Sequence, residues 1–250
     1  MKKVQKIIRE ELLKEAEDIV TIAGSGSAVE VGVSGKGLTT LEGLDIPEKV
    51  AYFNCADNKL TSLKGGPKTV RYEMGCDNNQ LTSLKDGPLK IGHFYCENNK
   101  LTSLEGSPSK VGEFKVSNNQ LTSLKGGPQT ATWFVCSNNK LTSLKGAPQK
   151  IMGELDCSNN KLTSLKGAPQ KIDKGHFDCS FNQLTSLKGG PQTVDKGYFS
   201  CNDNKLTSLK DAPKSVRGSF SCQNNPGPNG DGFTEEDVRA VCDVKGQIYL

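Results

Sequence analysis

Hydrophobic residues recur along this chain with a period of 20 to 22 residues. The tetrapeptide Leu-Thr-Ser-Leu occurs eight times, and the steps between copies are 21, 20, 20, 20, 21, 22 and 22 residues. A weaker copy, residues 38–41, precedes the first by 22 residues. A fixed period of this size indicates a stacked repeat architecture. The eight copies begin at Leu60, Leu81, Leu101, Leu121, Leu141, Leu162, Leu184 and Leu206.

One repeat, residues 91–110, shows the elements that the pattern predicts. Phe94 and Cys96 alternate with polar and aromatic residues, which is the period-two signature of a short strand with one face in a core. Two asparagines then end the strand, and Leu101 and Leu104 return to the core. Glycine and proline turn the chain back toward the next strand.

The repeat resembles the leucine-rich repeat pattern L-x-x-L-x-L-x-x-N-x-L. Its five marked places are filled here by Ile91, Phe94, Cys96, Asn99 and Leu101. The short period and the phrase Asn-Asn-x-Leu-Thr-Ser-Leu are similar to the bacterial subclass found in type III secretion effectors and in related bacterial and phage proteins. The resemblance implies a solenoid with a parallel sheet on a concave face and a mostly irregular convex side.

Three regions follow from these patterns. Residues 25–226 form the predicted solenoid of about ten repeats, beginning with a divergent strand at 28–33. Residues 1–24 predict an amphipathic helical cap, because apolar residues recur there at three- and four-residue steps through position 20. The alternative is a helix that pairs with a partner or with its own copy. Residues 227–250 predict a C-terminal cap, with a short helix from an N-cap at Thr234 to about Val241 and a last strand at 247–250.

The repeats differ in length at one place. The distance from the first apolar position to the strand aromatic varies between repeats. It is three residues from Val50 to Phe53, four from Val70 to Met74, and five from Ile172 to Phe177. The Leu-Thr-Ser-Leu phrase never changes length. We therefore expect the extra residues to enter just before the strand, where a bulge or wider turn absorbs them.

Stacking turns each repeat position into a column. The third core place is cysteine in most repeats, and we expect this column to be small buried thiols, since no Cys-x-x-Cys pair suits a metal. The column comprises Cys55, Cys76, Cys96, Cys136, Cys157, Cys179, Cys201 and Cys222. We expect the asparagine column to form a structural ladder that satisfies backbone groups. It comprises Asn58, Asn79, Asn99, Asn119, Asn139, Asn160, Asn182, Asn204 and Asn225.

A lysine follows most copies of the tetrapeptide, with Glu105 as the exception. A row of positive charge could track phosphates, which makes nucleic-acid binding an alternative function. The acidic residues elsewhere and the net charge of +4 favour a solvated edge that keeps the solenoid soluble. The column comprises Lys64, Lys85, Lys125, Lys145, Lys166, Lys188 and Lys210.

The outward strand positions vary while the rest of the repeat is copied. In the resembled family these positions line the concave face, which is the usual binding surface. They mix aromatic residues, which supply rigid contact area, with acids, which select basic partners. Asp57, Asp77, Glu97 and Asp203 add negative charge at the strand exits. The alternative is a solvated face with incidental aromatics. The candidate binding residues are Tyr52, Glu73, His93, Tyr95, Glu113, Trp133, Glu154, Asp156, His176, Asp178 and Tyr198.

Composition bears on the cellular compartment of the protein. Apolar residues make up 34% of the 250, and no run of about 18 apolar residues or apolar signal region is present. We expect the nine cysteines to be free thiols in a reducing compartment, the cytoplasm of the producing cell or of an infected host cell.

We therefore predict a non-enzymatic module that binds a basic protein partner, without cofactor or metal and without a membrane. A scaffolding role is a further alternative. Some resembled effectors carry a ubiquitin-ligase domain with a catalytic cysteine after the repeats. Only about 25 residues follow Asn225, too few for such a domain, and Cys242 has no activating histidine nearby, since His93 and His176 are the only two.

Overall fold

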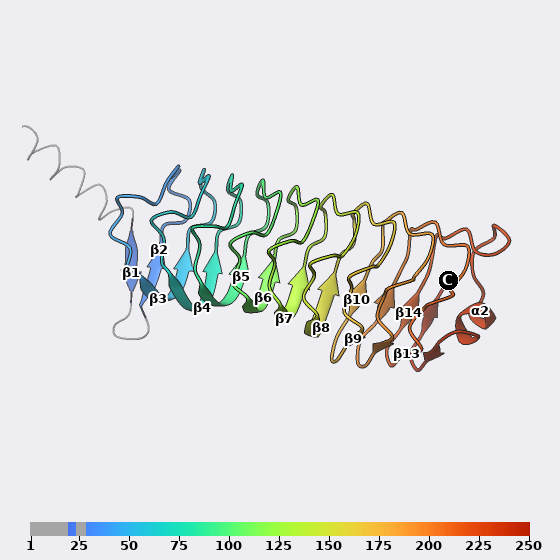
Figure 1. Cartoon of the computed structure of the whole chain (residues 1–250). Helices are drawn as coiled ribbons and strands as arrows, with labels where there is room; N and C mark the ends of the chain where they lie inside the picture. The colour runs from blue at the N-terminus through green and yellow to red at the C-terminus, as the bar shows by residue number, and fades with distance from the viewer. Residues whose placement is uncertain (1–19, 24–28) are drawn as a thin grey trace, which may run out of the picture.

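A computed structural model describes residues 20–23 and 29–250 (Figure 1). Most of the predicted N-terminal helix lies outside the described residues. Its last part is wrong, because β1 (Thr21–Ala23) is a strand that pairs antiparallel with β2 (Glu30–Gly32). The edge strand of a sheet leaves backbone groups unpaired, and β1 satisfies those of β2. The strand expected at 28–33 is confirmed as β2.

The central coils each contribute one strand to a parallel sheet. Figure 1 shows these strands side by side along one side of an elongated solenoid, with irregular segments along the other side. The strands follow chain order, so each coil pairs with the coil before and the coil after it. They are β3 (Lys49–Asn54), β4 (Thr69–Gly75), β5 (Lys90–Tyr95), β6 (Lys110–Lys115), β7 (Thr130–Val135) and β8 (Lys150–Asp156).

The longer coils split the strand in two. Where five residues separate the first apolar place from the aromatic, the residues between leave the sheet and two short ladders form. With four residues the register shifts, as between Val70 and Glu73. The expected insertion point is thus confirmed. The paired short strands of this kind are β9 (Lys171–Ile172) with β10 (Phe177–Asp178) and β11 (Thr193–Val194) with β12 (Phe199–Ser200). The coil of β13 (Ser215–Val216) and β14 (Phe220–Ser221) is also split, although only four residues separate Val216 from Phe220.

The core is a set of continuous columns inside the coil. The aromatic rings stack, with Phe94 and Phe114 at 5.6 Å between centroids and Phe177 and Phe199 also at 5.6 Å. Both leucines of every Leu-Thr-Ser-Leu copy are buried. Each such side chain contributes about 1.5–3 kcal/mol on leaving water, so two leucines and one aromatic per coil suffice for a narrow core.

The cysteine and asparagine columns lie as expected. All nine cysteines are buried and free. In the ladder, Asn79 Nδ2 donates to the carbonyls of Cys55, Cys76 and Asp77 at 3.0–3.1 Å, and its Oδ1 accepts from the Leu60 N–H at 2.9 Å. One side chain thereby satisfies the strand end of its own coil and the backbone of the preceding one.

The last residues return to the sheet. α2 (Glu235–Arg239) begins at the expected N-cap, Thr234, which forms a capping box with Asp237. The helix ends two residues before the expected Val241. β15 (Asp243–Val244) and β16 (Ile248–Tyr249) then extend the two ladders, which confirms the expected last strand. The capping role of both terminal segments stays a prediction. In the described part of the chain, no helix is long and apolar enough to span a membrane.

Candidate binding face on the parallel sheet

The structure brings all eleven predicted residues to one surface, the outward side of the sheet. We call it the outer sheet face. Its first column lies just before the buried aromatic of each coil, and its second column just after. Pairing registers align the columns from coil to coil. The first column is Tyr52, Glu73, His93, Glu113, Trp133, Glu154, His176 and Tyr198, and the second is Asn54, Gly75, Tyr95, Lys115, Val135, Asp156, Asp178 and Ser200.

The acids at the strand exits occupy two positions rather than one. Asp77 and Glu97 directly follow the core cysteine and are half-buried. Asp57 and Asp203 lie one residue later, in left-handed backbone with φ of 57° and 51°. All four acids thus follow a strand, as expected, but they belong to two columns that differ in backbone conformation.

A glycine precedes most first-column residues and leaves room for the rings of this face. The sequence patterns did not predict this feature. A Cβ on Gly153 would lie 2.4 Å from Trp133 Nε1, and one on Gly197 would lie 2.4 Å from His176 Nδ1. The ring of one coil thus lies over the glycine of the next, where a side chain would collide. The recurrence of glycine just before a variable face residue was the available signal.

Near the middle of the sheet, Glu113 is the centre of a cluster in which a lysine balances its negative charge. Its carboxylate accepts from the Tyr95 hydroxyl at 2.8 Å and pairs with Lys115 Nζ at 3.0 Å. Lys115 Nζ also lies 5.0 Å from the centre of the Tyr95 ring. Burial alone would raise the pKa of Glu113, but these two hydrogen bonds lower it below its usual value. His93 Nδ1 lies 4.0 Å from the same carboxylate.

Further along the face, Glu154, Asp156 and Asp178 form an acidic cluster. Asp156 and Asp178 are direct partners across neighbouring strands. The pKa of Glu154 is raised by burial and then by the charges of Asp156 and Asp178. The pKa of Asp178 is raised by burial and further by Asp156. In the described residues no ion pair neutralises these three carboxylates, and the cluster carries surplus negative charge.

Aromatic groups flank the acidic cluster. Trp133 is 41% exposed and pairs in register with Glu154. On the other side, the His176 and Tyr198 rings stack with centroids 4.2 Å apart, and His176 Nδ1 accepts from the Tyr198 N–H at 3.1 Å. Burial, followed by the charges of Asp178 and Glu154, raises the pKa of Tyr198 to about 12.

Two further residues, on β4, lie beside Tyr52. Tyr72 lies with its ring centroid 5.1 Å from that of Tyr52, and Arg71 lies 4.9 Å above the Tyr72 ring. Both residues belong to the bulge of β4, where the register shifts. The signal in the sequence was the extra residue of this repeat.

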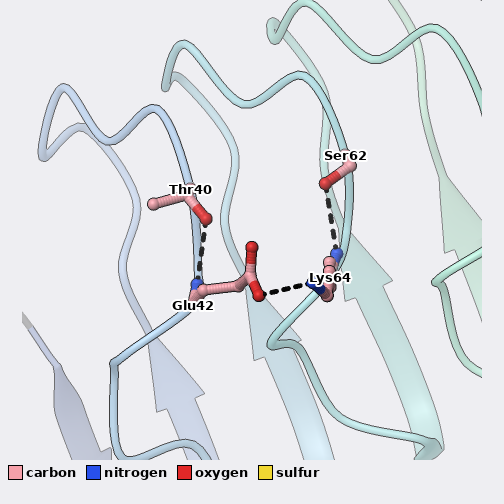
Figure 2. A network of polar contacts seen from close by, with 4 residues as sticks. All are labelled: Thr40, Glu42, Ser62 and Lys64. Carbon is pink, nitrogen blue, oxygen red and sulfur yellow. Dashed lines mark hydrogen bonds and ion pairs between the residues drawn. The ribbon is translucent and has the colours of Figure 1, made fainter.

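The lysine column lies on a different edge, after the tetrapeptide. Figure 2 shows its first member: Lys64 Nζ pairs with Glu42 of the preceding coil at 2.8 Å, and the Lys64 N–H donates to Ser62 Oγ. The Glu42 N–H donates to Thr40 Oγ1 in the same way. The serine of the repeated phrase therefore closes a local turn, which explains its constancy.

Positive charge along this edge is balanced only at the first coils. Lys85 lies 3.4 Å from Glu105, the exception in the column. The later lysines are exposed, and the described residues offer them no ion pair. They are Lys125, Lys145, Lys166, Lys188 and Lys210.

Two further features bear on catalysis: clusters of metal-ligating side chains and the Cys242 thiol. Within residues 20–23 and 29–250, no group of three or more histidine, cysteine or acidic side chains is arranged to hold a metal ion. Cys242 is buried, and burial followed by the charge of Asp243 raises its pKa to about 11. A thiol with a raised pKa is a poor nucleophile at neutral pH.

Comparison with known proteins supports the repeat architecture. No family model matches the sequence, and a search of curated proteins gives no match. The structure is similar to YopM from Yersinia enterocolitica WA-314, with a TM-score of 0.59 and 25% sequence identity over 70% of this chain. The match spans 38% of the YopM chain. The predicted likeness to leucine-rich repeat effectors is confirmed, and the chain is a leucine-rich repeat solenoid of about nine turns.

Proposed function

We propose that this leucine-rich repeat solenoid is a non-enzymatic module that binds a basic protein segment on its outer sheet face. The architecture is generally that of a protein-interaction scaffold. Its likeness to YopM, a type III effector, extends the proposal to a host protein as partner and to the cytoplasm as its location.

The acidic cluster is the observation that carries the proposal. Glu154 and Asp178 are held with raised pKa values beside Asp156, so their mutual repulsion costs stability in the free protein. A partner cation would relieve that repulsion, and Trp133 would supply contact area beside it. A merely solvated face would gain nothing from placing three acids together.

Trp133, the only tryptophan of the chain, provides a direct assay. Titration with an oligolysine peptide should change its fluorescence, because the peptide would lie against an indole that is 41% exposed. The double variant Glu154→Gln/Asp178→Asn should lose at least tenfold in affinity. The same variant should also lose partners captured from the native cell and identified by mass spectrometry.

A matched control separates the face from net charge. Asp45→Asn/Asp231→Asn removes the same two charges from exposed positions off the face. It should bind oligolysine as the wild type does at moderate salt. Equal weakening by both double variants would mean that only total charge matters, and the outer sheet face would then not be the binding site.

Nucleic-acid binding along the unpaired lysines is the second candidate function. It requires affinity for duplex DNA that falls steeply with salt and that Lys145→Gln/Lys166→Gln/Lys188→Gln removes. We expect no such retention in a gel-shift assay, because the acidic face opposes a polyanion. A steep salt dependence that is lost in the triple variant would favour this candidate over the first.

A further inference from the structure

Phe181 departs from the pattern of the coil corners. The residue after the strand exit adopts left-handed backbone in coil after coil, and elsewhere it is asparagine or aspartate, apart from Gly35 in the first coil. Those two residues tolerate this conformation better than others do. At Phe181 a bulky aromatic residue has φ of 54°, and its side chain is 53% exposed.

Phe181 lies outside the hydrophobic core and is not among the partly buried residues that pack against it. The Phe181 N–H donates to the carbonyl of Asn202, and its own carbonyl accepts from Asn160, as any residue could do. Corner asparagines add side-chain bonds that phenylalanine cannot, such as Asn98 Nδ2 to Asn78 Oδ1 at 2.8 Å. The ring contacts found among the described residues do not include Phe181. Backbone strain that no structural contact offsets is typical of a functional position.

The position of Phe181 points to the kind of contact. It follows Asp178 by three residues, so the two Cα atoms lie at most about 10 Å apart. Between them, the Ser180 N–H donates to Asp178 Oδ1 at 2.8 Å and fixes that carboxylate. An exposed apolar residue therefore follows the acidic cluster on the same coil, three residues after Asp178.

We propose that Phe181 contacts an apolar side chain of the same basic segment that binds the outer sheet face. Cationic side chains of the segment would lie over Glu154, Asp156 and Asp178, and its apolar residue would pack on the Phe181 ring. The inference rests on the proposed function and adds the composition of the partner: basic, with an apolar residue next to the cations.

Two lysine-rich peptides that differ only in the central residue, leucine or serine, test this pairing through Trp133 fluorescence. The wild type should bind the leucine peptide about tenfold more tightly, as expected for one partly buried leucine. Phe181→Asn should bind both peptides with the wild-type affinity for the serine peptide. It should also unfold at a higher urea concentration, with an unfolding equilibrium constant lower by about fivefold or more.

A relocated ring provides the control. Adding Asn118→Phe to Phe181→Asn places the aromatic residue in the same column three coils away, at about 14 Å from its original place. This variant should regain the strain without regaining the preference for leucine. A regained preference would show that any exposed ring suffices, and the assignment of Phe181 would fail.

The outcomes separate the two proposals. Equal binding of both peptides by the wild type, or a preference that survives Phe181→Asn, overturns the role of Phe181 and leaves the proposed function standing. A lower urea midpoint for Phe181→Asn would show that the ring serves the fold, which also overturns it. Binding of neither peptide, or unchanged binding by Glu154→Gln/Asp178→Asn, overturns the proposed function and this inference with it.

Discussion

Replacing Asn139 with alanine would measure what the asparagine ladder contributes. Asn139 is buried, with 8% of its surface exposed, and makes four hydrogen bonds. Its Nδ2 donates to the carbonyls of Val116, Cys136 and Ser137 at 3.0–3.1 Å, and its Oδ1 accepts from the Leu121 N–H at 2.9 Å. Alanine would leave that buried N–H without a partner.

The expected loss follows from these contacts. A net contribution of about 1 kcal/mol for each hydrogen bond gives a loss of about 4 kcal/mol in the free energy of unfolding. The cost falls where two coils meet, and a solenoid is stabilised chiefly by such neighbour contacts. Trp133 lies in the same coil as Asn139, so urea unfolding followed by its fluorescence reports on the affected region.

The neighbouring residue provides the control. Asn138 is exposed and left-handed with φ of 53°, which glycine adopts without strain. Asn138→Gly should therefore change stability by only a few tenths of a kcal/mol. A loss below about 1 kcal/mol for Asn139→Ala would refute the reasoning, because the buried N–H would then have found another partner.

Three further predictions concern the face and the core. Gly153→Ala should displace the Trp133 indole, which shifts its emission maximum and costs about 1–3 kcal/mol by overpacking; an unchanged spectrum would contradict the seating of the ring. The raised pKa values of Glu154 and Asp178 mean that the folded state holds these protons more tightly. Their stabilising effect is therefore full below the ordinary values of 4.5 and 3.8 and is lost as pH rises through the raised ones. Glu154→Gln/Asp178→Asn should accordingly exceed the wild type in stability at neutral pH but not below pH 3.8, and a constant difference in urea titrations would refute this. Because the nine thiols are buried, iodoacetamide should label them only after unfolding, and mass spectrometry showing rapid labelling of the native protein would contradict the buried column.

Some features of the site were readable in the repeats, and others were not. Alternation about Phe94 was enough to place His93 and Tyr95 on the outward side, because side chains alternate along any strand. The partners of those residues were not readable. Lys115 pairs with Glu113, whereas Glu154 forms no ion pair within the described part of the chain, and this difference depends on side-chain positions across neighbouring coils. The split of β9 from β10 was foreseen as a bulge or wider turn before the strand, but its size was not, since it depends on how the neighbouring coil pairs.

By itself, the sequence determined the period, the inward columns and the choice of variable face. It could do so because each coil repeats one local pattern, and stacking carries that pattern through the solenoid. Only the tertiary structure decided three other matters: the strand pairing of Thr21–Ala23, the position of the Trp133 ring over Gly153, and the left-handed backbone at Phe181. The first joins residues 7 to 11 positions apart outside the repeated unit, the second joins residues 20 positions apart in neighbouring coils, and the third depends on the corner geometry of one coil. The repeated local pattern encodes none of them.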